Sequence, residues 1–320
     1  MAFGCVGIGG LYEPVEHDEA IAALQSAATA GVGYFDVAPV YGIGRAERRL
    51  GEFLKAYEET HPAVTVSTKV GRLLRPAATA GERDVAAPRF FAEPHPSSVL
   101  FDYTYDGTLR SISESLARLD RDHIEIVFIH DPDQHFETAL SGAYRALENL
   151  RGQGVVQAIG VGMTQTELLC RFAREGNFDC FLLAGRYTLL DVSALTELLP
   201  LCVAKQIAVI VGGAFNSGIL AKPWLPRRTF DYQPAAPLRI KHARSLAEIT
   251  ERHGVPLAAA ALQFALGHPA VAAVLMGPRS VAETVEDIRL FELDIPAAVW
   301  IELQESRLLP DGVPVPSGAH

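Results

Sequence analysis

Short apolar segments alternate along the chain with longer amphipathic segments. The apolar segments are rich in Val and Ile and are bounded by Gly, Pro or polar residues, which is typical of strands buried on both faces. They are CVGIGG (5–10), GYFDV (33–37), VTVSTKV (64–70), IEIVFIH (124–130), VVQAIGVG (155–162), FDCFLLA (178–184), IAVIVGG (207–213) and VAAVLMG (271–277).

The longer segments between these strands have the period of amphipathic helices. Residues 18–30 place Ile21, Leu24 and Ala28 on one stripe, and Gly31 follows as a stop signal. Similar patterns occupy 45–56, 108–119, 137–151, 165–175, 192–203, 239–253 and 280–290.

Strict alternation of eight such units predicts an α/β protein with a closed (β/α)8 barrel, the TIM barrel, over residues 1–320 as one domain. A doubly wound sheet is the competing architecture, but it usually has fewer strands. No shift in composition and no linker divides the chain. Two connections are long, 71–106 and 214–237, and both follow strands, so we expect binding loops at the catalytic face.

Composition and charge narrow the class of protein. The sequence has 320 residues, 49% hydrophobic and 21% charged, which is ordinary for a globular protein. A net charge of −10 argues against nucleic acid or an anionic membrane as partner. The four cysteines form no Cys-x-x-Cys motif, and neither a signal peptide nor a transmembrane run is found, so we expect a cytoplasmic protein with reduced thiols.

Polar residues at the ends of consecutive strands carry the candidate chemistry. Asp36, Lys69 and His130 close the second, third and fourth apolar runs, and Tyr41 follows Asp36 in a Pro/Gly-rich turn. In a barrel, the carboxyl ends of the strands meet at one face. The four side chains are therefore expected around one mouth.

These four residue types make a proton-transfer site. A lysine ammonium favours the phenolate of a nearby tyrosine, and a carboxylate keeps that lysine charged. A histidine can bind the substrate oxygen, and hydride chemistry at the same carbon requires a nicotinamide. Singly, each residue has a structural interpretation, as a helix cap, a packed ring, a salt bridge or a satisfied polar group; together, at one mouth, they favour catalysis.

The segments GYFDVAPVYGIGRAERRLG, VSTKVG and DHIEIVFIHDPD resemble the signature series of the aldo-keto reductases. The resemblance extends nearly from end to end. It implies a (β/α)8 barrel, a catalytic tetrad and a nicotinamide cofactor. Carried onto this sequence, the tetrad is Asp36, Tyr41, Lys69 and His130.

The same resemblance implies where the cofactor binds. Residues beside the nicotinamide would be Met163, Thr164 and Arg186. Those in the seventh-strand loop, under the pyrophosphate, would be Phe215, Asn216, Ser217, Gly218 and Leu220. Those at the adenosine end would be Gly277, Arg279, Ser280, Glu283 and Asp287.

Three departures from the family pattern modify this picture. Gly212 or Gly213 stands where many relatives stack a tyrosine on the nicotinamide, and Phe215 is the candidate substitute. Glu283 stands where relatives hold the 2′-phosphate of NADP with an arginine. A carboxylate there repels phosphate and accepts ribose hydroxyls, so we expect NAD, although Arg279 leaves NADP open. The pyrophosphate would bind at the helix beginning at Ser280.

The third departure is the first apolar run, which begins almost at Met1. Many members have a β-hairpin before the first strand, so we expect a barrel without it or a start codon assigned too late. The alternative is that the tail, 310–320, covers that end of the barrel.

Within the family, LYEPV, FDYTYDGTLRSISESLARL, AGRYTLLD and FNSGIL resemble a branch of sugar and pyridoxal dehydrogenases. The branch includes L-fucose, D-threo-aldose and L-galactose dehydrogenases and pyridoxal 4-dehydrogenase. The resemblance implies oxidation of an aldose such as L-fucose, D-arabinose or L-galactose to a lactone, or else a pyridoxal 4-dehydrogenase or a general aldehyde/ketone reductase. Substrate contacts would come from Leu11, Tyr12, Tyr103 and Trp224.

Two further interpretations are less well supported. HDPDQH (130–135) could hold a metal in a barrel hydrolase, but adjacent residues on one loop rarely all face one ion. The scaffold also resembles potassium-channel β subunits, which bind cofactor as regulatory subunits. The expected partner is a small sugar or aldehyde, no metal is expected, and the sequence leaves the oligomeric state open.

Overall fold

Eight parallel strands form the barrel of the protein. The computed structural model describes the whole chain except residues 77–83, 87–96, 227, 232 and 318–320. The hydrogen-bonded strand order closes on itself as β1-β13-β10-β9-β8-β7-β3-β2, and this confirms the predicted barrel. The strands are β1 (Ala2–Gly4), β2 (Tyr34–Asp36), β3 (Thr65–Val70), β7 (Ile124–His130), β8 (Val156–Met163), β9 (Cys180–Ala184), β10 (Ala208–Gly212) and β13 (Val271–Met276).

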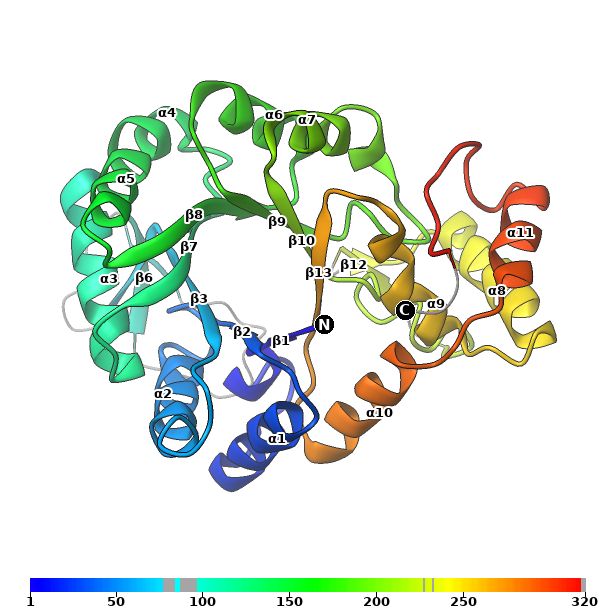
Figure 1. Cartoon of the computed structure of the whole chain (residues 1–320), viewed down its shortest axis with the longest axis horizontal. Helices are drawn as coiled ribbons and strands as arrows, with labels where there is room; N and C mark the ends of the chain where they lie inside the picture. The colour runs from blue at the N-terminus through cyan, green and yellow to red at the C-terminus, as the bar shows by residue number, and fades with distance from the viewer. Residues whose placement is uncertain (77–83, 87–96, 227, 232, 318–320) are drawn as a thin grey trace. The chain divides into compact units, whose positions relative to one another are not determined.

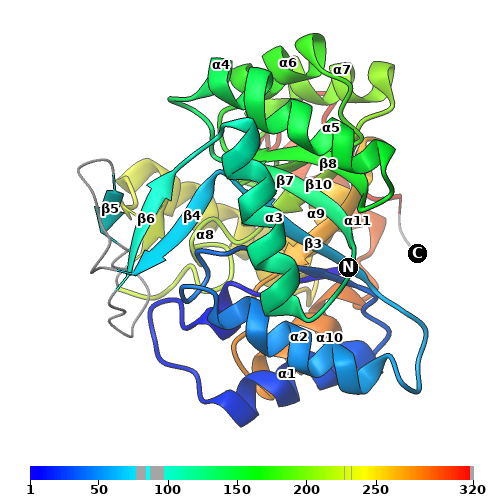
Figure 2. The ribbon, with the colours of Figure 1, turned by 90° about the vertical axis from the view of Figure 1, so that its left-hand side faces the viewer.

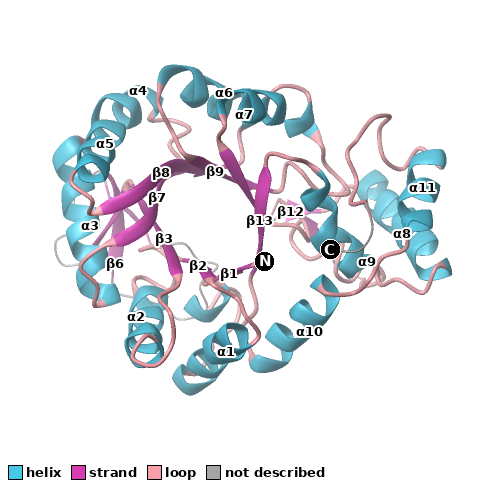
Figure 3. Cartoon of the chain, viewed as in Figure 1, coloured by secondary structure: helices cyan, strands magenta, loops and turns pink. Residues whose placement is uncertain are grey.

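Helices follow the strands as the amphipathic pattern predicts. The predicted segments correspond to α1 (His17–Thr29), α2 (Arg45–Tyr57), α3 (Tyr105–Leu119), α4 (Phe136–Thr138) with a π-helical turn η3 (Ala139–Ala143) and α5 (Tyr144–Gly152), α6 (Thr166–Glu175), η4 (Ser193–Leu195) with α7 (Leu198–Lys205), α8 (Pro237–Arg252) and α10 (Val281–Phe291). Figure 3 shows α1, α2 and α3 outside the strands β1, β2 and β3.

The chain divides into two compact units. The first contains residues 1–181 and 277–286, and the second contains residues 182–276 and 287–320. In the first unit, β1, β2, β3, β7 and β8 lie side by side in that order (Figure 1). All four tetrad residues belong to this unit.

The core of the first unit joins strands to helices through aromatic rings. Phe35 on β2 lies 5.8 Å from the ring of Phe3 on β1 and 5.8 Å from that of Phe53 on α2. Gly51 allows α2 to approach α3, since a Cβ there would lie 2.4 Å from the Leu119 carbonyl oxygen. These contacts fix β2 and β3, and with them the strand ends that carry Asp36 and Lys69.

The second unit contains two helices that the pattern did not predict. They are α9 (Leu257–Phe264), followed by the 3-10 turn η5 (Ala265–Gly267), and α11 (Ala297–Glu305). All residues of α9 are buried, so it has no polar face and shows no helical periodicity. Its Phe264 packs between Tyr187 (5.2 Å) and Trp300 (6.5 Å).

The predicted first strand, 5–10, is wrong. Only Ala2–Gly4 pairs with β2, and Gly7–Gly9 forms a 3-10 turn, η1. The glycines of this run serve close backbone approach. A Cβ at Gly7 would lie 2.7 Å from the Gly277 carbonyl oxygen, and one at Gly9 would lie 3.0 Å from the Tyr41 carbonyl carbon. The turn therefore fits between the Tyr41 loop and the segment at Gly277.

Both long connections contain strands of their own. In the first, β4 (Arg72–Pro76) and β5 (Asp84–Ala86) pair antiparallel with β6 (Ser97–Phe101), as Figure 2 shows. In the second, β11 (Thr229–Phe230) pairs with β12 (Gln233–Pro234). Parts of both predicted binding loops, 77–83, 87–96, 227 and 232, lie outside the described residues.

The tail packs against other parts of the second unit, to which it belongs. A Cβ at Gly267, shortly before β13, would lie 2.5 Å from the Val315 carbonyl carbon, and Gln304 donates to the Val313 carbonyl oxygen at 3.1 Å. The predicted covering segment 310–320 is described only as far as residue 317.

Candidate active site

A buried ion pair joins the ends of β2 and β3. Lys69 Nζ donates to both Asp36 carboxylate oxygens, at 2.8 and 2.6 Å, and to the Val37 carbonyl at 2.9 Å. The Lys69 and Asp36 side chains are only 2% and 3% exposed. Burial lowers the pKa of Lys69, but Asp36 and Tyr41 outweigh burial and leave that pKa above its ordinary value. The lysine therefore stays charged at neutral pH.

Ser67 completes the support of this pair. Its hydroxyl donates to Asp36 Oδ1 at 2.7 Å and accepts from the Tyr34 hydroxyl at 3.0 Å. Ser67 was not predicted from the sequence, although strand periodicity indicates it: Ser67 precedes Lys69 by two residues, so both side chains point to the same face of β3.

Tyr41 is held by an unusual turn. Gly42, Ile43 and Gly44 have φ values of +58°, +55° and +77°, a run that glycine tolerates best. The Tyr41 ring packs against a buried cluster of Ala38, Val40 and Val99, which includes a residue of β6. The antiparallel sheet of β4, β5 and β6 thus helps to fix the position of Tyr41.

The Tyr41 hydroxyl belongs to the same electrostatic group as the ion pair. Lys69 Nζ lies 4.9 Å from the centroid of the tyrosine ring. Burial raises the pKa of Tyr41 to about 12, Lys69 lowers it and Asp36 raises it. The expected effect of the lysine is present, but burial outweighs it, so Tyr41 is a neutral phenol at pH 7.

His130 ends β7 beside Tyr41. The two rings meet edge to face with centroids 6.2 Å apart. Burial, with smaller effects of Arg72 and Lys69, holds the pKa of His130 well below its ordinary value, so its ring is neutral. Within the described part of the chain, His130 Nδ1 is buried without a hydrogen-bond partner. The carboxylate of Asp131 lies 3.6 Å from Nε2. The ring proton therefore belongs on Nε2, because a carboxylate favours a donor facing it.

Tyr103 requires a correction. It was predicted to line the substrate pocket, but it is 2% exposed and supports the site from behind. Its hydroxyl donates to the carbonyls of His130 (2.7 Å) and Asp131 (3.0 Å). Gly71, at φ +101°, makes room for the ring, since a Cβ there would lie 2.1 Å from Tyr103 Cε1.

The other predicted substrate residues lie in different surroundings. Leu11 and Tyr12 follow β1, and Tyr12 is 57% exposed with φ +66°. Trp224 is half exposed and packs on helix α8, where its Nε1 donates to Glu251 at 3.2 Å and Arg244 lies over its ring. The surroundings of Trp224 are those of a packed surface ring.

The predicted cofactor residues of the first unit fall in two places. Met163 ends β8 and is 1% exposed, and Thr164 donates to Gln165 at 3.1 Å. At the other place, Arg279 donates to Glu283 Oε1 (2.7 Å) and to Glu13 Oε2 (2.8 Å). Glu13 was not predicted from the sequence, because it lies 266 positions from Arg279 in the chain.

Helix α10 begins at this second place. Ser280 Oγ accepts from the Glu283 backbone N–H at 3.2 Å, as a capping residue does. Gly277 directly follows β13, and Asp287 lies one turn beyond Glu283 on α10. The first N–H groups of a helix have no partner within it, so this end of α10 can accept a phosphate.

In the second unit, the predicted cofactor residues surround the loop after β10. Arg186 forms a bidentate pair with Asp231, at 3.1 and 2.7 Å. Asn216 is buried, accepts from Thr188 at 2.6 Å and donates to the Gly185 carbonyl at 3.2 Å. The side chain of Leu220 is fully buried, Phe215 is half-buried, and Ser217 and Gly218 are exposed. Asn216 and Leu220 thus shape this loop from inside.

The side chains of HDPDQH diverge. Asp131 pairs with Arg72 at 2.6 Å, whereas His135 stacks on the rings of Tyr103 (5.1 Å) and Phe101 (5.9 Å). Among the residues that the structure describes, no group of three or more His, Cys, Asp or Glu side chains could hold a metal ion.

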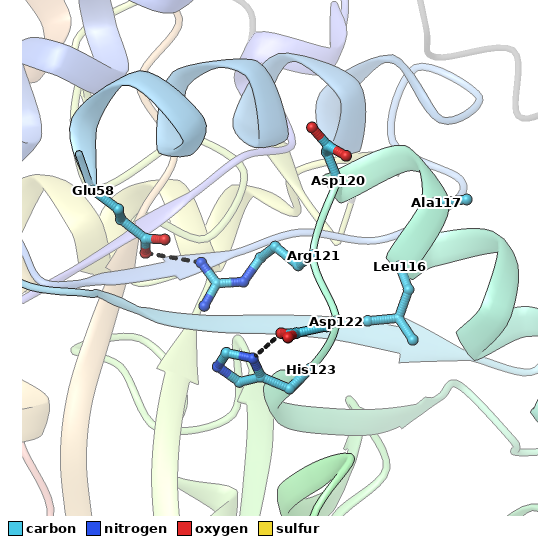
Figure 4. Close-up of a pocket in the computed structure, with 7 residues that line it drawn as sticks. All are labelled: Glu58, Leu116, Ala117, Asp120, Arg121, Asp122 and His123. Atoms are coloured by element: carbon cyan, nitrogen blue, oxygen red, sulfur yellow. Dashed lines mark hydrogen bonds and ion pairs between the residues drawn. The ribbon is translucent and has the colours of Figure 1, made fainter.

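A surface pocket of about 540 Å³ lies at the opposite end of β7 (Figure 4). In it, Arg121 donates to Glu58 at 2.8 Å, and His123 contacts Asp122 at 2.6 Å. Each carboxylate that lines it already contacts a basic side chain, Asp120 that of Lys55, and the amino-terminal end of barrel strands is the face associated with stability. The buried cluster around Tyr41 is therefore the better candidate for the active site.

Comparison with known proteins agrees with this geometry. Residues 1–307 match the model of the Aldo/keto reductase family. The chain belongs to this family. It is 38% identical over 313 residues to a D-threo-aldose 1-dehydrogenase from Pseudomonas sp, covering 97% of this chain and 94% of that protein. It is 37% identical over 327 residues to a pyridoxal 4-dehydrogenase from Microbacterium luteolum, covering 97% and 94%.

A solved structure gives the same fold. The glycerol dehydrogenase AKR11B4 from Gluconobacter oxydans superimposes with a TM-score of 0.74 at 21% identity, over 100% of this chain and 94% of that chain. The predicted family and branch are confirmed, and the protein is an NAD(P)-dependent oxidoreductase. In the described part of the chain, no helix is long and apolar enough to cross a membrane.

Proposed function

We propose that this aldo-keto reductase oxidises the anomeric hydroxyl of an aldose to a lactone, with NAD as its cofactor. The observation that carries the proposal is the buried Tyr41–Lys69–Asp36 group beside a neutral His130, in a chain 38% identical to an aldose dehydrogenase. Candidate substrates are L-fucose, D-arabinose and L-galactose. The four cysteines are buried and form no disulfide, which suits a reducing compartment such as the cytoplasm.

Each tetrad residue has a role in moving one proton. Tyr41 accepts the proton of the anomeric hydroxyl, and Lys69 stabilises the phenolate that takes it. Asp36 holds the ammonium of Lys69 in place with two hydrogen bonds. His130 donates from Nε2 to the same substrate oxygen, which orients the sugar. When bound, a nicotinamide supplies the acceptor for the hydride of the anomeric carbon.

The residues around Arg279 fit the adenosine end of NAD. Two carboxylates, Glu13 and Glu283, already bind the Arg279 guanidinium, so the group of three has a net negative charge. The 2′-phosphate of NADP would have to displace a carboxylate, whereas the ribose hydroxyls of NAD can donate to Glu283. The start of α10 offers N–H groups to the pyrophosphate.

Exchange of this carboxylate tests the cofactor preference. Glu283→Arg removes the repulsion and adds a phosphate donor, so we expect the NADP/NAD ratio of kcat/KM to rise by at least tenfold. The control is Glu286→Arg on the same helix, which adds the same charge change. An unchanged ratio in Glu283→Arg, or an equal shift in both variants, would contradict the cofactor argument.

Pyridoxal 4-dehydrogenase activity is the second candidate, supported by the relative at 37% identity. Reduced-cofactor absorbance at mildly alkaline pH distinguishes the candidates, with NAD and NADP each tested on L-fucose, D-arabinose, L-galactose and pyridoxal. Turnover of one aldose with NAD supports the proposal. Turnover of pyridoxal alone would identify pyridoxal as the substrate. If none of the four compounds is oxidised, but NADPH is consumed when simple aldehydes are added, the enzyme is a reductase.

A further inference from the structure

A second ion pair lies next to the tetrad and neither takes up nor gives up a proton in the transfer described above. Asp131 directly follows His130, and Arg72 begins β4, three residues after Lys69. Arg72 Nη2 donates to Asp131 Oδ2 at 2.6 Å. The two side chains are 20% and 34% exposed, so the pair is partly shielded but still reachable from solvent.

The backbone fixes Asp131 in an unusual conformation. Its φ is +42°, in the left-handed region that few non-glycine residues adopt. Its N–H donates to the Gly162 carbonyl at 2.9 Å, and its carbonyl accepts from the Tyr103 hydroxyl at 3.0 Å. Such strain persists only where surrounding contacts impose it, and it is concentrated at functional sites. Here it aims the carboxylate along the edge of the active site.

The carboxylate is close to the atoms that handle the proton. Asp131 Oδ2 lies 3.6 Å from His130 Nε2, too far for a hydrogen bond between them. Its charge also raises the pKa of Tyr41. Two groups at this separation can each bind one oxygen of a vicinal diol, His130 the reacting oxygen and Asp131 its neighbour.

The pair also has unused hydrogen-bonding capacity. Among the described residues, the hydrogen bond to the Asp131 carboxylate comes from Arg72 Nη2 and is accepted by Oδ2. Arg72 Nε is buried without a partner among these residues. A hydroxyl group both donates and accepts, which suits a carboxylate beside a guanidinium.

We propose that Asp131, oriented by Arg72, binds the hydroxyl on the carbon adjacent to the reacting carbon of the sugar. This rests on the proposed aldose oxidation and names which hydroxyl the site recognises. Asp131 is thus a specificity residue that touches substrate, and Arg72 is a positioning residue. The pair makes the enzyme favour 2-hydroxylated aldoses over 2-deoxy sugars and simple alcohols.

A purely structural ion pair between β4 and the loop after β7 is the competing explanation. Exposed and half-exposed pairs contribute little to stability. The Tyr103 hydroxyl already ties this loop to the segment after β6 with two hydrogen bonds. A structural pair would affect all substrates equally, and this separates the two explanations.

The test compares substrates in the wild-type enzyme and in Asp131→Asn. Asn tolerates the left-handed backbone and keeps the size of the side chain, but it loses the charge. The substrates are the best aldose of the panel, its 2-deoxy analogue and its 3-deoxy analogue. The wild type should oxidise the 2-deoxy sugar with a kcat/KM about 10- to 100-fold lower than the parent, and should discriminate less against the 3-deoxy sugar.

In Asp131→Asn, the kcat/KM for the parent aldose should fall by about 10- to 100-fold, while that for the 2-deoxy sugar should stay within about threefold of wild type. The matched control is Asp133→Asn, an exposed residue of the same loop, which should leave both values unchanged. Equal losses on both sugars, or no wild-type discrimination at the adjacent carbon, would overturn the proposal. If Asp131→Asn does not fold, the wild-type comparison of the two deoxy sugars decides alone. If the wild type oxidises no aldose, the proposed function fails and this inference fails with it.

Discussion

The two ends of strand β7 carry similar residues in different environments. At its start, His123 is 42% exposed and contacts Asp122 (2.6 Å) and Glu125 (3.0 Å). At its end, the His130 side chain is 11% exposed, and its Nδ1 lacks a partner among the described residues. Each end also has an arginine paired with a carboxylate, Arg121 with Glu58 and Arg72 with Asp131.

The difference shows that residue type alone does not make an active site. At the start of β7, Arg121 is only 7% exposed, but its guanidinium is paired with both Glu58 and Glu125, as Figure 4 shows for Glu58. At the end of β7, burial shifts the pKa of Tyr41 upward and that of His130 downward. Buried groups with shifted pKa values and incomplete hydrogen bonding are the ones that can act on a substrate.

The largest expected effect is at Tyr41. Tyr41→Phe keeps the packed ring but removes the group that accepts the proton, so kcat should fall by about 10² to 10⁴. Binding of NADH, followed by its fluorescence, should remain close to wild type because the hydroxyl alone is removed. A kcat within twofold of wild type would remove Tyr41 from the mechanism.

The two histidines give the most direct contrast between the ends of β7. His130→Gln replaces the rigid ring donor aimed at the substrate oxygen by a flexible amide, and kcat/KM should fall by about 10² to 10³. His123→Gln makes the same substitution at the start of β7, and its kcat/KM should stay within about twofold of wild type. Initial rates of the two purified variants measure this, and comparable losses would mean that burial does not distinguish the two ends.

Two glycines should differ in their effect on the free energy of unfolding: Gly71, which packs against Tyr103 behind the active site, and Gly152, which has no neighbour close to it. Gly71→Ala would place a Cβ against the Tyr103 ring at positive φ, so unfolding free energy should fall by about 2–4 kcal/mol. Gly152→Ala, in α5, meets nothing within 4 Å and should leave stability unchanged or slightly higher. Urea denaturation measures both, and a neutral Gly71→Ala would show that Tyr103 is not held as described.

A further expected effect is a gradient with pH. Oxidation requires Tyr41 to take up a proton, and its pKa is raised to about 12, chiefly by burial. Below that pKa, the phenolate fraction increases about tenfold for each pH unit, so oxidation should accelerate from pH 7 to 10. The reverse reaction uses the protonated phenol and should show no such rise. A flat oxidation profile would contradict the role of Tyr41 as base.

Much of the fold could be predicted because its elements are periodic. Seven of the apolar runs after the first correspond to barrel strands, whereas CVGIGG was mistaken for a strand because its glycines serve close backbone packing. Helix α9 was missed because burial on all sides leaves no polar stripe. Strands β4 and β6 were missed because they lie within a connection that was expected to be a loop.

The structure brings the predicted tetrad together because strand ends of a barrel converge, which the sequence order already indicates. What could not be predicted depends on contacts distant in the sequence. Tyr103 has the composition of a pocket residue, but its burial follows from the room left by Gly71. Glu13 neutralises Arg279 from the other end of the chain, and Asp131 was considered only as a metal ligand because its pairing with Arg72 was not visible.

The central claim is that the buried end of β7 oxidises an aldose at its anomeric carbon. Carbon NMR of a C1-labelled aldose, with the enzyme and NAD, tests it most directly when absorbance of NADH is followed in the same sample. The account predicts a lactone carbonyl signal that grows in step with NADH and is lost in Tyr41→Phe. An unchanged C1 signal for every aldose of the panel, together with NADPH consumption by simple aldehydes, would contradict it.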